Sequence, residues 1–236
     1  MTYGDPTSGA ATKADGAYVE LRNQILLGTL SPGSRVDYAQ LSASLGVSIT
    51  PLREALRRLE ADHLVIRSAH RDVVIAPLSR AEAAELVAVR QELDFLAARL
   101  AAAHMTPDEL AAARKLVASQ DLDEAVRYLR DAGLPVTVGG LASVNRAFHR
   151  MVYCGSHNQV LIQYRDAIST RTERYVIIAS QLKTVPPEAY RLLHEKLLSA
   201  LEARDSLAAE DMMRAHYVEL DLDFANVIFG HVMEGH

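Results

Sequence analysis

Cysteine, tryptophan and long apolar runs are what this sequence of 236 residues lacks or nearly lacks. It has one cysteine, Cys154, and no tryptophan, and aromatic residues make up only 6% of it. A lone cysteine excludes an internal disulfide, which suits a protein of the reducing cytoplasm. No run approaches the roughly 18 apolar residues of a membrane-spanning helix, so we expect no membrane partner. With so few aromatic side chains, leucine and alanine must supply most of the core.

The N-terminal residues also lack the basic and then apolar layout of a signal peptide. They are small and polar, with many Gly, Ser and Thr residues. We therefore expect a disordered tail over residues 1–15.

The chain has no strong charge of either sign, and its net charge of −5 argues against a protein that coats nucleic acid. Residues 16–77 hold seven arginines and six acidic residues, whereas residues 78–236 hold 17 basic and 22 acidic residues. The first segment is therefore slightly basic and the second acidic. This mild asymmetry suits DNA binding through a few placed arginines.

Residues 48–60 predict a short amphipathic helix with a capped beginning. The hydroxyls of Ser48 and Thr50 can accept hydrogen bonds from the first N–H groups of the helix. Pro51 suits the first turn, because a missing N–H costs nothing there. Hydroxyls and arginines at this end suit a phosphate backbone and a major groove, which predicts a DNA-recognition helix. The apolar residues that follow at helical spacing are Leu52, Ala55, Leu56 and Leu59.

The segments on either side of this helix complete a DNA-binding domain. Helical periodicity over residues 17–27 and 38–45 places two helices before it, which gives a helix-turn-helix pattern. Two β-type segments, residues 64–67 and 73–75, follow it on both sides of a polar tip and predict a wing. Residues 16–77 are thus predicted to form a winged helix-turn-helix domain.

The rest of the chain has a helical pattern, with no strand alternation and no internal repeat. Residues 78–236 are therefore predicted to form an all-α bundle whose inner face could hold a small ligand. The fold class is mainly α. The expected helices span residues 80–104, 107–132, 140–154, 158–182, 187–203 and 206–230.

Three motifs in the first domain are similar to those of a known family. They are Ile25-x-x-Gly28-x-Leu30-x-Pro32-Gly33, Leu41-x-x-x-Leu45-Gly46-Val47-Ser48 and Thr50-Pro51-Leu52-Arg53-Glu54-Ala55-Leu56-Arg57-x-Leu59. The chain resembles the GntR family of bacterial transcription regulators, in its FadR subgroup with an FCD ligand domain. The resemblance implies contacts with double-stranded DNA from Arg35, Ser48, Thr50, Arg53, Arg57, His70 and Arg71.

Two positions depart from the family pattern. Ile49 stands where the family usually has an arginine, and Asp72 where the wing usually has a glycine. An isoleucine cannot donate a hydrogen bond to guanine, although it can touch a thymine methyl group. An acidic side chain near a phosphate repels it. We therefore expect this chain to read a different DNA sequence from that of typical relatives.

The second domain carries a candidate metal site. Asn145 and His149 lie four residues apart, so one helical face can present a carbonyl oxygen and an imidazole to the same point. The segment Asn145-x-x-x-Phe148-His149 resembles an FCD motif, and His194 and His216 stand where the family has two further histidines. Three imidazoles and one oxygen suit a divalent transition metal. The resemblance implies one zinc, nickel or manganese ion per subunit at Asn145, His149, His194 and His216.

Charge distinguishes this site from that of many relatives, which have an aspartate at the position of Asn145. We expect weaker metal binding, or an effector carboxylate that supplies the missing charge. Arg90 lies in the segment that resembles the first FCD helix, and its planar fork can hold two carboxylate oxygens. It is the predicted effector-binding residue. The histidines that fit no such pattern are predicted surface or tail residues, and they are His63, His104, His157, His231 and His236.

These features predict a transcription regulator, and specifically a repressor, that binds an inverted-repeat operator as a homodimer. A small organic acid would control it through the helical domain. An activator would have the same fold and the same DNA contacts as a repressor. A metal sensor, in which the ion itself is the signal, is an alternative to control by an organic acid. A metal-dependent hydrolase is another, but Glu195 points about 100° away from the neighbouring His194 on a helix. We therefore predict that the protein is not an enzyme.

Overall fold

The computed structural model describes residues 12–67, 72–132, 141–182, 186–219 and 224–230. The chain divides into two compact units, Met1–Pro77 and Leu78–His236. No helix in the described part of the chain combines the length and the hydropathy that a membrane crossing would need.

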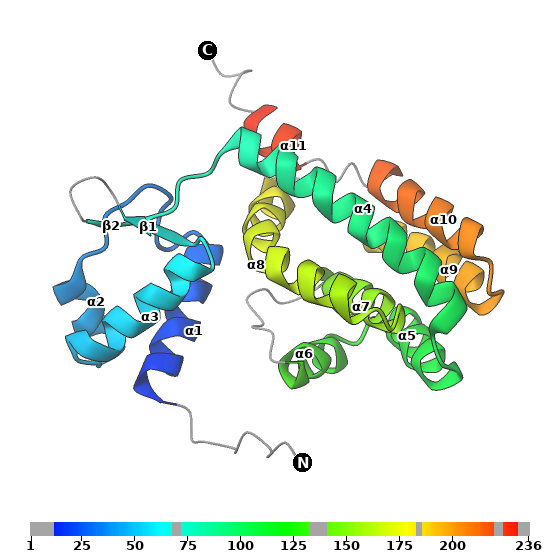
Figure 1. Ribbon diagram of the computed structural model, residues 1–236, viewed down its shortest axis with the longest axis horizontal. Helices are drawn as coiled ribbons and strands as arrows, with labels where there is room; N and C mark the ends of the chain where they lie inside the picture. The colour runs from blue at the N-terminus through cyan, green and yellow to red at the C-terminus, as the bar shows by residue number, and fades with distance from the viewer. Residues whose placement is uncertain (1–11, 68–71, 133–140, 183–185, 220–223, 231–236) are drawn as a thin grey trace. The chain divides into compact units, whose positions relative to one another are not determined.

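Among the described residues of the first unit, three helices form its helical part (Figure 1). They are α1 (Lys13–Leu26), α2 (Tyr38–Leu45) and α3 (Ile49–Ala61), and both α1 and α2 pack against α3. The four apolar residues at helical spacing in α3 are all buried, as predicted. Helix α2 ends at Gly46, whose φ of 62° is left-handed and therefore favours glycine.

Helix α1 begins earlier than predicted. The backbone N–H of Asp15 donates to the Thr12 hydroxyl, and the Asp15 carboxylate accepts from the Thr12 N–H in return. This reciprocal pair is a capping box, and it starts the helix at Lys13. The prediction of a disordered tail is therefore wrong for residues 13–15, while residues 1–11 lie outside the described part.

The predicted wing is confirmed as an antiparallel pair of strands, β1 (Val65–Arg67) and β2 (Val73–Ile75). Val65 pairs with Ile75 in the register. The segment before α2 joins the free edge of β2, where Arg35 forms a bridge with Val74. Two predicted DNA contacts of the wing tip, His70 and Arg71, lie outside the described residues.

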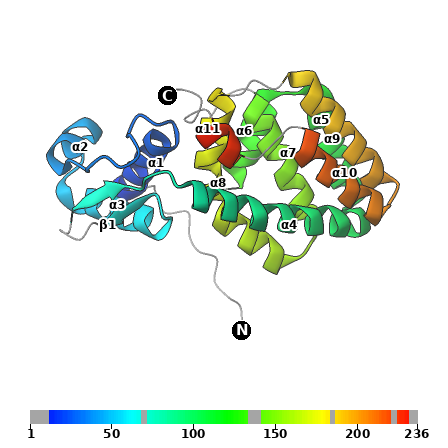
Figure 2. The same cartoon turned by 90° about the horizontal axis from the view of Figure 1, so that it is seen from above.

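The second unit is a bundle of helices around α4, the longest of them (Figures 1 and 2). Helix α4 packs against α7, α8, α9, α10 and α11, and α10 runs beside it. The winged helix-turn-helix unit and this all-helical unit confirm the predicted fold class. The helices are α4 (Arg80–His104), α5 (Pro107–Ser119), α6 (Leu122–Asp131), α7 (Leu141–Gly155), α8 (Gln159–Leu182), α9 (Pro187–Glu202), α10 (Ser206–Glu219) and α11 (Phe224–Gly230).

The single helix predicted over residues 107–132 is wrong, because the chain breaks between α5 and α6. Gln120 adopts a left-handed conformation with φ of 51°, which ends α5. The Asp121 carboxylate then accepts a hydrogen bond from the backbone N–H of Glu124 and caps α6. The region predicted as one helix over residues 206–230 contains α10 and α11, and residues 220–223 between them lie outside the described part.

The main core of the second unit surrounds the predicted ligand site. Phe148, beside His149 in α7, is fully buried, and its ring centroid lies 4.2 Å from that of His194. An apolar shell of this kind keeps water away from neighbouring polar side chains. Buried residues of this core include Phe95, Ala98, Phe148, Leu197, Leu198, Met213 and Tyr217.

Candidate functional site

The N-terminal end of α3 presents an exposed row of predicted DNA-contacting side chains. Ser48, Ile49, Thr50 and Arg53 are all exposed. Ser48 occupies the N-cap position, but its side chain makes no capping hydrogen bond, so the predicted capping role of its hydroxyl is wrong. Ser48 is exposed, so its hydroxyl is accessible to a phosphate oxygen that could accept from it.

The arginines of α3 differ in their partners. Arg53 makes no ion pair with any described residue, whereas Arg57 donates two hydrogen bonds to the Glu54 carboxylate, at 2.8 and 3.1 Å. This pair is exposed, and exposed pairs are weak enough for a phosphate to compete with them. Arg58 lies over the Tyr18 ring, 4.2 Å from its centroid, and pairs with Asp15. Arg58 therefore joins α3 to α1.

The wing residue Asp72 pairs with a predicted DNA contact. Its carboxylate lies 3.2 Å from the guanidinium of Arg35, and 74% of the Arg35 side chain is exposed. The sequence predicted that Asp72 would repel a phosphate. The structure adds that Asp72 also neutralises an arginine on the same surface.

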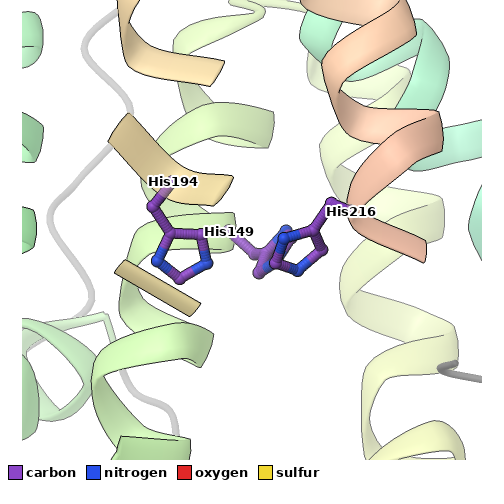
Figure 3. A group of neighbouring side chains, drawn as sticks. All are labelled: His149, His194 and His216. Atoms are coloured by element: carbon purple, nitrogen blue, oxygen red, sulfur yellow. The ribbon is translucent and has the colours of Figure 1, made fainter. Parts of the chain in front are cut away.

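Three histidines from three helices point toward one another in the second unit (Figure 3). His149 lies on α7, His194 on α9 and His216 on α10. One ring nitrogen of each can be chosen so that all three lie within 4.8 Å of one another. The Nε2 atoms of His149 and His216 are 2.9 Å apart, and Nε2 of His194 is 3.0 Å from Oδ1 of Asn145. The structure thus brings together all four residues predicted as metal ligands.

Burial keeps these imidazoles neutral. His149, His194 and His216 are at most 4% exposed. Burial lowers the pKa of His149 and His194 well below the usual value, and the neighbouring histidines add to the effect. Burial, together with the charge of Arg90, lowers the pKa of His216 to about 4. At neutral pH each ring therefore keeps a lone pair, which is the form that binds metal ions.

The hydrogen bonding of the cluster also fits a cation. The Nδ1 atoms of His149, His194 and His216 are buried and have no hydrogen-bond partner among the described residues. Each neutral imidazole has one N–H and one acceptor nitrogen, so the rings carry more polar atoms than the cluster satisfies. A divalent ion can take up converging lone pairs, and three imidazoles and an amide oxygen are donors that suit zinc or nickel.

A second buried group lies beside the histidines. The Asp94 carboxylate accepts hydrogen bonds from Arg165, at 2.6 Å, and from the Tyr217 hydroxyl, and it lies 3.4 Å from Nε of Arg90. Burial alone raises the pKa of Asp94, but the charges of Arg165 and Arg90 outweigh it and hold the pKa below its usual value. Asp94 is therefore an ionised carboxylate shared by two buried arginines.

Arg90, the predicted effector contact, is buried and close to the histidines. It is 7% exposed, and its charge lowers the pKa of both His149 and His216. Its guanidinium carbon lies 5.7 Å from the centroid of the Tyr217 ring. The spacing of Arg90 and Asp94 on one helix already allowed their ion pair, but the sequence did not indicate Arg165 and Tyr217 as further partners of Asp94.

The ring of Tyr190 also lies beside the cluster, whereas Glu195 does not take part in it. Tyr190, one turn before His194 on α9, has its ring 6.3 Å from that of His194 and 6.4 Å from that of His216. Its position four residues before His194 is the one sequence signal that could have indicated it. Glu195, the acid considered for a hydrolase, instead pairs with Arg191.

Two family profiles match the chain. "Bacterial regulatory proteins, gntR family" matches residues 13–75, and "FCD domain" matches residues 85–219. The chain belongs to the GntR family of bacterial regulatory proteins, with an FCD domain. The family resemblance predicted from the sequence motifs is thus confirmed.

Comparison with individual proteins supports the same family assignment. The chain is 26% identical over 212 residues to GlaR, a transcriptional repressor of Escherichia coli K12, and the alignment covers 87% of this chain and 92% of GlaR. It is 28% identical over 152 residues to the regulator McbR of the same strain, over 64% of this chain and 65% of McbR. The solved structure of E. coli McbR matches with a TM-score of 0.63 at 24% identity, over 91% of this chain and all of that one, which indicates a common fold.

Proposed function

We propose that this GntR-family regulator is a homodimeric repressor whose operator affinity is controlled by a small carboxylate at a metal centre of the FCD domain. The convergence of three buried, neutral histidines beside a buried arginine carries the effector half of the proposal. The exposed end of the recognition helix, inside a GntR match, supports the DNA half.

On the DNA side, α3 would enter the major groove with its N-terminal end first. Ser48 and Thr50 would donate to phosphates, Arg53 would reach a base edge or a phosphate, and Ile49 would contact a thymine methyl group. Two copies of the chain would place two such helices on an inverted repeat. Secondary contacts would come from Arg35, Arg57, His70 and Arg71.

In the FCD domain, His149, His194, His216 and Asn145 would hold one divalent ion, such as zinc, nickel or manganese. The ion would supply an open coordination position to an oxygen of the effector. Arg90 would bind the carboxylate and orient it toward that position. A ligand that binds one arrangement of the dimer more tightly than another shifts the population between them, and in this way it would change operator affinity.

Repression, as opposed to activation, is supported by the name of the relative GlaR, which is a transcriptional repressor. A metal sensor is the second candidate, and the closeness of the three ligand atoms favours it. Operator affinity measured during a metal titration, with and without organic acids, separates the two. Full response to the ion alone identifies a sensor of the metal.

The DNA half is tested by selecting bound sequences from random duplexes and measuring affinity for the selected site. We expect Arg53→Gln to weaken binding by about 5- to 150-fold, because a base contact is worth about 1–3 kcal/mol. Arg58→Gln is the matched control, since Arg58 pairs with Asp15. Equal loss in both variants would contradict a specific contact from Arg53.

The metal half is tested by the metal content of purified protein and of His149→Ala. We expect about one ion per subunit in the wild type and none in the variant. His157→Ala is the control, because His157 is exposed and pairs with Glu109 instead. Wild-type protein that takes up no zinc, nickel or manganese would overturn the metal centre and leave a metal-free effector pocket.

A further inference from the structure

Arg67, the last residue of β1, contacts the recognition helix α3 through its side chain. Its Nε–H donates to both carboxylate oxygens of Glu60 on α3, at 3.1 and 3.0 Å. Strand β1 also packs against α3 (Figure 1). The guanidinium of a wing residue therefore lies beside the recognition helix. The sequence motifs assigned no role to Arg67.

The partner of Arg67 shows which face of α3 this charge occupies. Glu60 lies three residues after Arg57 and seven after Arg53, and residues at these spacings share one face of a helix. Arg53 and Arg57 are exposed predicted DNA contacts. The rise of a helix places Glu60 about 10 Å beyond Arg53 along the axis. Arg67 therefore extends the row of arginines on this face toward the C-terminal end of α3.

The backbone of the wing places Arg67 near a further predicted DNA contact. In the register of the two strands, Arg67 lies opposite Val73, which directly follows Asp72. The Asp72 carboxylate pairs with Arg35, whose segment bridges to the other edge of β2. Arg67 and Arg35 therefore lie on the two sides of β2. In this way Arg67 joins the predicted contacts of α3 to those of the wing.

The ion pair with Glu60 leaves most of the Arg67 guanidinium available. Only Nε donates to Glu60, and the terminal nitrogens Nη1 and Nη2 have no hydrogen-bond partner among the described residues. The side chain of Arg67 is 56% exposed and that of Glu60 35%. The two terminal amino groups form an edge of the planar fork that can bind two oxygens of one phosphate. A phosphate can therefore bind Arg67 while Glu60 still accepts from Nε.

We propose that Arg67 binds a phosphate of the operator backbone, and that Glu60 orients its guanidinium while lowering its affinity for DNA. This inference rests on the DNA half of the proposed function and adds a contact to it. A phosphate contact carries no sequence information, so Arg67 fixes the position of the wing on the duplex and strengthens binding to any sequence. Glu60 orients Arg67 through an acceptor oxygen, but its charge repels the phosphate.

A purely structural role of the pair makes different predictions. If Arg67 and Glu60 only join β1 to α3, loss of either partner disturbs the recognition helix in the same way. If Arg67 binds a phosphate, the two substitutions have opposite effects on affinity. Arg67→Gln removes the contact, whereas Glu60→Gln removes the opposing charge and keeps an oxygen that can accept from Nε.

The experiment measures the affinity of the full-length protein for the selected operator and for a scrambled duplex of equal length, by fluorescence anisotropy between about 50 and 200 mM salt. We expect Arg67→Gln to weaken binding to both duplexes by the same factor, about five- to tenfold at roughly 0.1 M salt, since one phosphate contact changes affinity about eightfold for each tenfold change in salt. The slope of log affinity against log salt should become shallower by about 0.9. Glu60→Gln should strengthen binding several-fold.

Two matched controls separate this contact from bracing and from charge in general. Arg58→Gln makes the same substitution in an arginine that also joins α3 to a neighbouring element, through its ion pair with Asp15 on α1. It should leave the salt slope unchanged. Glu20→Gln removes from α1 the same charge that Glu60→Gln removes from α3, outside the predicted contacts, and should leave the affinity unchanged.

The outcomes are distinct. An unchanged salt slope in Arg67→Gln, a loss confined to the operator, or no gain in Glu60→Gln overturns the phosphate contact and leaves DNA binding by α3 in place. Failure of the wild type to select any sequence from random duplexes overturns instead the DNA half of the proposed function.

Discussion

The guanidinium of Arg35 and the carboxylate of Asp72 form an ion pair of 3.2 Å across the edge of the wing. Arg35 lies in the segment that bridges to Val74 of β2, and Asp72 directly precedes that strand. The pair therefore occupies the surface that the family resemblance assigns to DNA. It places an acid where a phosphate would otherwise meet an arginine.

Removal of this acid should strengthen DNA binding. We expect Asp72→Asn to raise operator affinity several-fold at moderate salt, because Arg35 no longer has an acidic partner that competes with phosphate. The slope of log affinity against log salt should become steeper by up to about 0.9, the value for one added phosphate contact. Glu20→Gln makes the same charge change on α1, outside the predicted contacts, and serves as the control. Unchanged affinity and slope in Asp72→Asn would show that the wing edge does not meet DNA.

Close packing at Gly155 gives a prediction for the stability of the FCD domain. A Cβ atom at this position would lie 2.2 Å from Cγ and 2.9 Å from Sδ of Met105, which is 1% exposed. We expect Gly155→Ala to lower the free energy of unfolding by about 1–3 kcal/mol, as overpacked cores do. Gly16→Ala is the matched control, because Gly16 lies in α1 with no atom near its Cβ position. It should gain about 0.5–1 kcal/mol from the helix preference of alanine. Denaturant unfolding measures both, and a neutral Gly155→Ala would contradict the close contact.

The capping box of α1 gives a prediction for pH dependence. Hydrogen bonds from the side chain and the backbone of Thr12, followed by the bond from Arg58, lower the pKa of Asp15 from 3.8 to about 2. A carboxyl whose pKa is lower in the folded state contributes stability above pH 3.8, and this contribution disappears as pH falls from 3.8 to about 2. Thr12→Ala should raise the pKa of Asp15 toward its usual value. A carboxyl-carbon NMR titration measures this pKa, and an unchanged value would mean that Arg58 alone sets it.

The sequence predicted those parts of the fold that are encoded locally. The amphipathic pattern of α3 and the two β-type segments of the wing each lie within a few residues, and the structure contains them as expected. Helical periodicity does not predict the break between α5 and α6, because Gln120 is an unusual residue for a left-handed conformation. The spacing of Asp121 and Glu124, a common capping pattern, was the signal available for it.

The candidate site likewise contains residues that the sequence predicted and residues that it did not. Asn145 and His149 share a helical face and are found together by spacing, and the two further histidines came from the family resemblance. The prediction that His63, His104 and His157 are surface residues is confirmed, whereas the last two histidines lie outside the described residues. The contacts of Arg165 and Tyr217 with Asp94 could not be predicted from the sequence. Arg165 and Tyr217 lie 71 and 123 residues from Asp94 in the sequence. Helical periodicity does not indicate which turns of different helices come into contact.

Substitution of Asp94 tests how strongly this buried group supports the domain. In Asp94→Asn, the buried guanidiniums of Arg90 and Arg165 lose the only carboxylate that the described structure pairs with both of them. Loss of one partner from a buried ion pair costs about 3–5 kcal/mol, because a charge remains uncompensated. We expect a loss of this size in the free energy of unfolding.

Tyr217→Phe provides the graded comparison for Asp94→Asn. It removes one hydrogen bond to Asp94 while both ion pairs remain, and should cost about 1 kcal/mol. Denaturant unfolding of the metal-free protein measures the two variants under the same conditions. If Asp94→Asn is no more destabilising than Tyr217→Phe, the carboxylate does not compensate the two arginines.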